Sequence, residues 1–176
     1  MLIVNVIAGC IASIILSFIT YAYVHELRLL QSHQGTIDNI SAIAHMISDI
    51  LESTAGSGNN GQPVNNEKVM KAIAKSSFSG AWVTIYDTTD SGQVLLDGSR
   101  TIENGGGYQG SGGDTPGADQ REALEAVLKA EKESNIPGVS TARRVGKAPN
   151  GALRTITLSS ARPTPESNLL VVVQAV

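Results

Sequence analysis

The sequence begins with an apolar run, LIVNVIAGCIASIILSFITYAYV, which occupies positions 2–24 and contains no charged residue. An α-helix needs about 20 mostly apolar residues to cross the hydrocarbon core of a bilayer. A cleavable secretory signal has basic residues at its start and a shorter apolar stretch, whereas the first Lys or Arg here is Arg28. The run therefore predicts a retained transmembrane anchor over residues 1–25.

Small residues recur along this predicted anchor. Gly9, Ser13 and Ser17 are four positions apart, so they lie on one face of a helix, and Asn5 lies one further step before them. Such a face lets a second helix approach closely in the membrane, either a helix of another protein or a second copy of this chain. Small residues are also common in membrane helices without such a role, and both interpretations stay open.

The helical pattern continues beyond the anchor. Leu30, Ile37, Ala44 and Leu51 are seven positions apart, and the first proline of the sequence is Pro63. We expect one helix from residue 2 to about residue 53, with residues 26–53 forming a stalk. Its apolar seam either pairs with a second stalk or packs on the domain that follows, and we predict the latter for its C-terminal half.

Residues 54–176 are predicted to form a small domain of mixed secondary structure. Apolar periodicity and turn residues predict helices over 67–77 and 119–134, and strands over 81–87, 93–96, 139–145, 153–160 and 169–175. Short connections join most of these elements, which favours an antiparallel sheet. We expect an α+β fold in which the stalk helix packs on a five-stranded antiparallel sheet.

Composition and motifs exclude several classes of function. With 16% charged residues and a net charge of −3, the chain lacks the basic surface that binds nucleic acid. Cys10 is the one cysteine, so neither an intrachain disulfide nor a thiolate metal cluster forms. His25, His33 and His45 lack the spacing of a helical metal site. With no nucleophile beside a base and no cofactor motif, we expect a protein that is not an enzyme and has no metal or cofactor.

Arginines and aromatic residues on the predicted strands suggest a binding site. Arg144 and Arg154 lie on neighbouring strands, opposite Trp82 and Tyr86 on the first strand. Guanidinium groups bind carboxylates through paired hydrogen bonds, and aromatic rings supply apolar walls. These four residues are the predicted site for a small carboxylate ligand. The adjacent Arg143 has the same chemistry, and the alternative for any of the three arginines is a solvated strand face.

The order of elements resembles that of the single Cache domains of bacterial membrane receptors. The likeness covers nearly the whole chain: a membrane helix running into a long helix, a second helix (EKVMKAIAKSS), a hairpin (AWVTIYDTTDSGQVLLDGS), a third helix (REALEAVLKAEKE) and closing strands (LRTITLSSARPTPESNLLVVVQAV). The resemblance implies a PAS-like sensor domain outside the cytoplasm that binds a small molecule. We therefore expect a single-pass membrane protein with a sensory or ligand-binding domain.

Two other functions remain as alternatives. The apolar N-terminal helix resembles that of type IV pilins, in which it runs into an amphipathic half before a small sheet domain. However, position 5 is Asn5, where many bacterial pilins have glutamate, and no processing leader is visible. The pilin is the second hypothesis, and the third is a single-span accessory subunit of a larger membrane complex, held through its N-terminal helix.

Overall fold

The structure is a computed structural model of the chain. It describes residues 2–55, 67–77, 81–89, 92–98, 116–134, 139–148 and 151–176. Side-chain surroundings are described within these ranges except at residues 2–12, 29, 54–55, 67–68, 75–77 and 139. The chain divides into two compact units, residues 1–36 and 37–176. The helical residues after Thr36 therefore belong to the same unit as the sheet.

The described elements follow the predicted order. They are α1 (Leu2–Ala55), α2 (Glu67–Ser77), β1 (Ala81–Asp87), β2 (Gln93–Asp97), α4 (Ala118–Ser134), β3 (Val139–Lys147), β4 (Leu153–Ala161) and β5 (Leu169–Ala175). The boundaries predicted from the sequence differ from these by at most two residues. The predictions succeeded because the strands are rich in β-branched residues, whereas the helices carry apolar residues at helical spacing.

The five strands form one antiparallel sheet with the order β2-β1-β5-β4-β3. This confirms the α+β fold with a five-stranded antiparallel sheet. Strand β5 lies between β1 and β4, which the local sequence pattern does not show. In the turn between β3 and β4, Gly151 has a φ of 77°, a left-handed conformation that glycine adopts without steric cost.

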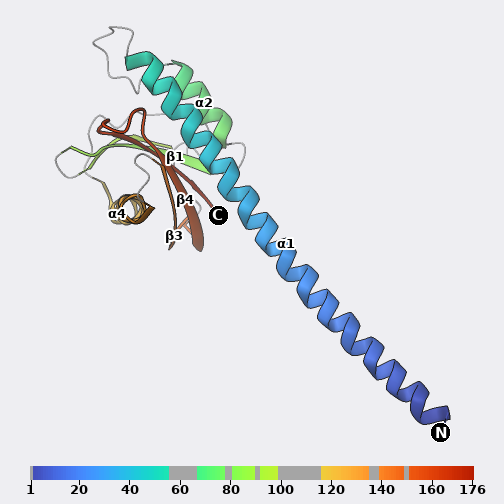
Figure 1. Cartoon of the computed structure of the whole chain (residues 1–176). Coiled ribbons are helices and arrows are strands. Elements are labelled where there is room, and N and C mark those ends of the chain that lie inside the picture. Colours follow the sequence, from blue (N-terminus) through green and yellow to red (C-terminus); the bar gives the residue numbers. More distant parts are fainter. Residues whose placement is uncertain are drawn as a thin grey trace. The chain divides into compact units, whose positions relative to one another are not determined.

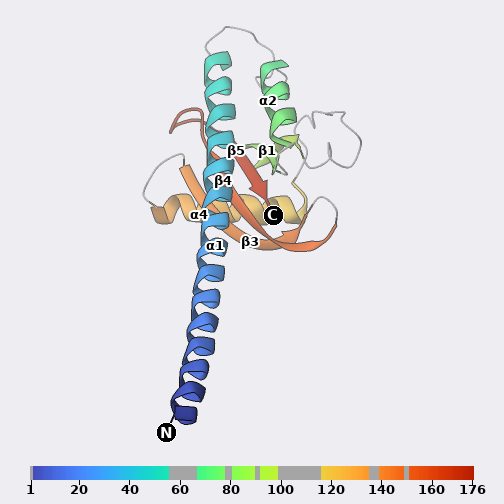
Figure 2. The same cartoon turned by 90° about the vertical axis from the view of Figure 1, so that its right-hand side faces the viewer.

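Helices cover both faces of the sheet (Figures 1 and 2). On one face, which we call the α1 face, residues 37–55 of α1 and helix α2 pack over β1, β2 and β5. The core on this face includes Ile40, Ala44, Ile47, Leu51, Val69, Ile73, Val83, Ile85, Leu96, Ala161, Val171 and Val173. The opposite face, the α4 face, is covered by α4, and its core includes Trp82, Tyr86, Val94, Ala123, Leu124, Val127, Ile156, Leu158, Leu170 and Val172.

The apolar seam of α1 packs on the sheet over its C-terminal half, as predicted. Ala44 and Leu51 are buried in the α1-face core, whereas Leu30 and His33 are exposed. The seam therefore serves intramolecular packing from about Ile40 onwards.

None of the helices, over the residues that the structure describes, contains a stretch long and apolar enough to span a membrane. Two of the residues predicted to pack against another membrane helix, Asn5 and Gly9, lie outside those whose side chains are described. The other two, Ser13 and Ser17, are exposed and line a shallow hollow on α1 together with Ile14 and Phe18. The anchor over residues 1–25 and its packing partner stay predictions.

Candidate functional site

The α4 face carries all four residues predicted for a ligand site, and the side chains of three of them are largely buried there. Side chains alternate between the two faces along each strand, so Trp82 and Tyr86 on β1 point toward α4, as does Arg144 on β3. Because β5 lies between β1 and β4, the aromatic residues and the arginines are on strands that are not adjacent. The site therefore extends across the sheet.

Trp82 and Tyr86 form part of the core beneath α4. Trp82 is 5% exposed and Tyr86 is fully buried. The Tyr86 hydroxyl donates a hydrogen bond of 3.1 Å to the carbonyl of Gln120, near the start of α4. Burial raises the pKa of Tyr86 well above its usual range, the negative charge of Asp97 raises it further, and a hydrogen bond with Thr84 and the charge of Arg144 oppose the rise. The phenol thus stays protonated and holds α4 on the sheet.

Arg144 has a buried guanidinium whose hydrogen bonds are incomplete. Its side chain is 9% exposed, and Nη1 lies 3.5 Å from Asp119 and 3.6 Å from Glu122, two carboxylates in the first turns of α4. Nη2 donates a long hydrogen bond of 3.5 Å to the buried amide of Gln174. Among the described residues, Nε and Nη1 have no hydrogen-bond acceptor.

The position of this guanidinium depends on Gly146, two residues along β3. A Cβ atom added at Gly146 would collide with Nη1 and would lie 2.7 Å from Cζ of Arg144. The absence of a side chain at Gly146 therefore leaves the space in which the guanidinium lies. This glycine is a positioning residue that the sequence reasoning missed.

Arg154, the fourth predicted residue, is placed differently. It pairs with Gly146 across β3 and β4, and its side chain is exposed. It lies on the same face of β4 as Ile156, which is buried under α4. Arg154 is therefore outside the buried cluster that surrounds Arg144.

Two further polar residues of the α4 face were not predicted from the sequence. Asp97, at the end of β2, is 6% exposed and accepts a hydrogen bond of 2.8 Å from the side-chain amide of Gln120. Gln174 on β5 contacts Arg144, as described above. Acidic or amide residues at strand and helix ends are frequent in any sequence, so only the tertiary fold identifies these two as buried partners.

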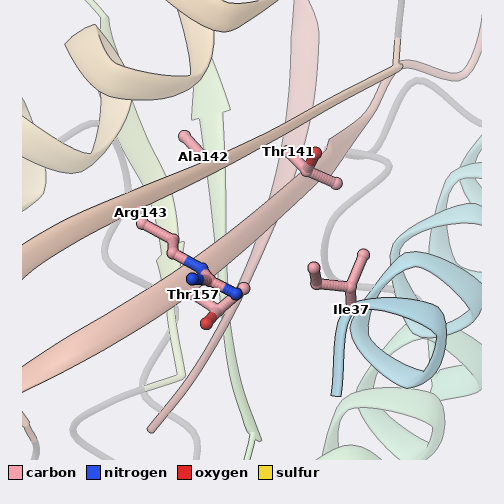
Figure 3. A pocket seen from close by; sticks show the side chains of 5 residues that line it. All are labelled: Ile37, Thr141, Ala142, Arg143 and Thr157. Carbon is pink, nitrogen blue, oxygen red and sulfur yellow. The ribbon is translucent and has the colours of Figure 1, made fainter. Parts of the chain in front are cut away.

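Arg143 points to the opposite face from Arg144, as the strand alternation requires. It lies opposite Thr157 on β4 and lines a pocket of about 250 Å³ together with Ile37, Thr141, Ala142 and Thr157. Figure 3 shows Ile37 on α1 facing the strand residues, with the guanidinium of Arg143 beside Thr157. The two adjacent arginines thus belong to separate surroundings.

No group of three or more His, Cys, Asp or Glu residues is placed to hold a metal ion in the part of the chain that the structure describes. His25, His33 and His45 are all on α1 and exposed. The site thus offers a guanidinium, carboxylates, amides and a phenol.

Comparison with known proteins identifies the fold. No protein-family model matches the sequence, and no curated protein matches it significantly. Among solved structures, a periplasmic sensor domain of a chemotaxis protein matches 84% of this chain and 96% of that chain, with a TM-score of 0.54 and 10% identity. A light-oxygen-voltage domain studied with a flavin analogue matches 65% of this chain and 87% of that chain, with a TM-score of 0.38 and 12% identity. The first similarity confirms the predicted Cache-like, PAS-like resemblance at the level of the fold.

Proposed function

We propose that the chain is a non-catalytic sensory domain, anchored in the membrane by residues 1–25, which binds a small carboxylate ligand on its α4 face outside the cytoplasm. The fold similarity to a periplasmic sensor domain supports the sensory role and the location. The apolar run over positions 2–24 supports the anchor. The buried guanidinium of Arg144, whose Nε and Nη1 lack acceptors among the described residues, supports the ligand class and carries the proposal.

A buried guanidinium with unused donors is energetically unfavourable. Removing a charged group from water without full hydrogen bonding costs several kcal/mol. Asp119 and Glu122 compensate part of this cost, but their side chains are 51% and 63% exposed and lie at the long end of the ion-pair range. A ligand carboxylate placed beside Arg144 would accept short, paired hydrogen bonds from Nε and Nη2 or from Nη1 and Nη2, and either pair would use one of the donors that lack an acceptor.

Such a ligand would alter the contacts that hold the start of α4. It would compete with Asp119 and Glu122 for Arg144, and both carboxylates belong to α4. The hydrogen bonds from Tyr86 and to Asp97 meet the same turn of the helix, at Gln120. Binding at Arg144 would therefore be transmitted directly to the N-terminal half of α4.

Thermal unfolding of the full chain in detergent tests this proposal with a panel of small carboxylic acids, each paired with its neutral amide. At a concentration 100 times Kd, a ligand that binds only the folded state adds about 2.7 kcal/mol to the free energy of unfolding. We expect one or more acids to raise Tm while the matching amides do not. R144Q should abolish this rise, and R154Q should retain it because Arg154 is exposed. Equal stabilisation by acid and amide, or an unchanged response in R144Q, would contradict the proposal.

G146A provides a second variant that keeps the arginine. The new methyl group would displace the Arg144 guanidinium without removing its charge. We expect G146A to remain folded and to weaken the stabilisation by the same acids. Full retention of the response in G146A would show that the ligand does not use the guanidinium in its present position.

A further inference from the structure

The second arginine of the pair, Arg143, stands at a separate pocket on the α1 face. The α1-face core covers β1, β2 and β5 but includes only Ala161 from β4. Toward β3, this face carries the exposed side chains of Thr141, Arg143 and Val145. The pocket lies at this uncovered part, where Ile37 of α1 reaches the strands.

The Arg143 side chain forms no hydrogen bond or ion pair with any residue that the structure describes, although its backbone pairs with Thr157 on β4. Its neighbour Arg144, in contrast, lies beside two carboxylates on the other face. The remaining pocket groups are the two threonines, whose hydroxyls can donate hydrogen bonds, and the apolar side chain of Ile37; the side chain of Ala142 packs on the α4-face core instead. The pocket thus combines a cation and hydroxyl donors with one apolar wall.

We infer that this pocket is a second ligand site, which binds a short-chain aliphatic carboxylate independently of the site at Arg144. The carboxylate would accept paired hydrogen bonds from the Arg143 guanidinium and a further bond from a threonine hydroxyl. The alkyl chain would pack on Ile37. The volume of about 250 Å³ is smaller than the roughly 300–1,000 Å³ of pockets for drug-sized ligands, so it suits an acid of a few carbon atoms.

Occupation of this pocket would affect α1. Ile37 is the first residue of the unit that contains the sheet. Helix α1 continues through this position from residues 1–36 into the unit. A ligand held between Ile37 and Arg143 would link this part of α1 to β3 and β4. It would therefore restrict the motion of α1 at the beginning of the unit.

NMR of the full chain in detergent tests the inference with butanoate as the probe and butanamide as its neutral match. Few atoms make contact, so binding is expected in the millimolar range, which NMR titration measures well. With methyl-labelled Ile and Thr, we expect saturable shifts at Ile37, Thr141 and Thr157 with butanoate. Butanamide should give much weaker shifts.

Three variants decide the result. R143Q should weaken butanoate binding about tenfold or more, because it removes a charge-assisted pair of hydrogen bonds. T157V, which replaces a hydroxyl by a methyl group, should weaken it less. R144Q should leave it unchanged, which separates this site from the proposed one on the α4 face. The inference is overturned if butanamide shifts the same methyl groups equally, or if R143Q binds butanoate as the unchanged chain does.

Discussion

At the scale of single residues, folding changes the pKa of the Tyr86 phenol. Its pKa is raised well above the ordinary value of about 10, chiefly by burial, so the folded state keeps the proton at a pH where the unfolded chain loses it. The folded state then binds more protons than the unfolded state, and stability falls as pH rises above about 10, by up to about 1.4 kcal/mol per pH unit. Below that pH, the contribution of this group is fully present.

Y86F tests this prediction. The variant loses the hydrogen bond to Gln120, so we expect it to be about 1 kcal/mol less stable than the unchanged chain at pH 8. Since phenylalanine does not titrate, the difference should shrink above about pH 10 and then reverse in sign. Urea unfolding from about pH 8 to about pH 11.5, a range that includes the usual tyrosine pKa, measures this difference. A difference that is constant across this range would contradict the interpretation.

At the scale of elements, α4 is held differently at its two ends. Near its C-terminal end, Arg162 of the β4–β5 connection forms a two-point ion pair with Glu131, at 2.9 and 3.2 Å. The same guanidinium donates a hydrogen bond of 2.8 Å to the carbonyl of Ser167. Side-chain exposures of 11% and 17% place this pair largely out of solvent. The N-terminal end is held by hydrogen bonds of Gln120 with Tyr86 and Asp97 and by the longer contacts of Asp119 and Glu122 with Arg144. A ligand at Arg144 would compete with these longer contacts.

R162A should therefore destabilise the domain strongly. Removing Arg162 takes the two-point partner from a largely buried carboxylate, which costs about 3 kcal/mol or more. Lysine at this position should restore only part of the stability, because an ammonium group cannot make the paired contact. The exposed pair Lys129–Glu133, at 3.9 Å on the same helix, provides the control, and K129A should change stability by less than about 0.5 kcal/mol. Urea unfolding that gives equal losses for R162A and K129A would remove the special role of this pair.

The sequence predicts local structure here better than it predicts the site. The β-branched and aromatic residues of the strands and the helical spacing on α4 are properties of neighbouring residues, so the elements followed from them. The strands β1 and β5 are buried on both faces, so their sequences carry no alternation that assigns a face. The burial of Arg144 depends on Asp119 and Glu122 from α4 and on Gln174 from β5, which local patterns do not bring together. The insertion of β5 between β1 and β4 likewise separates the arginines from Trp82 and Tyr86, because strand order is set by long-range pairing.

At the scale of the whole molecule, we expect residues 1–25 inside the bilayer and the sheet domain in the aqueous phase outside the cytoplasm. The uncharged run contains the one native cysteine, Cys10, whereas Glu166 is exposed in the β4–β5 connection. In a C10S background, E166C should react in intact cells with a maleimide that cannot cross the membrane. The unchanged chain, with Cys10 in the bilayer, should not react.

Fractionation completes this test, because a sensor and a filament subunit place the same helix in different surroundings. A sensor stays in detergent-soluble membranes after cells are sheared, since lipid covers its apolar run. A filament subunit instead appears in the sheared fraction, because its helix packs head to tail against copies of itself in an open assembly. We expect the labelled chain in the membrane fraction and not in sheared filaments visible by electron microscopy. Its recovery in filaments would contradict the sensor proposal and favour the pilin-like alternative, whereas labelling only after lysis would place the domain in the cytoplasm.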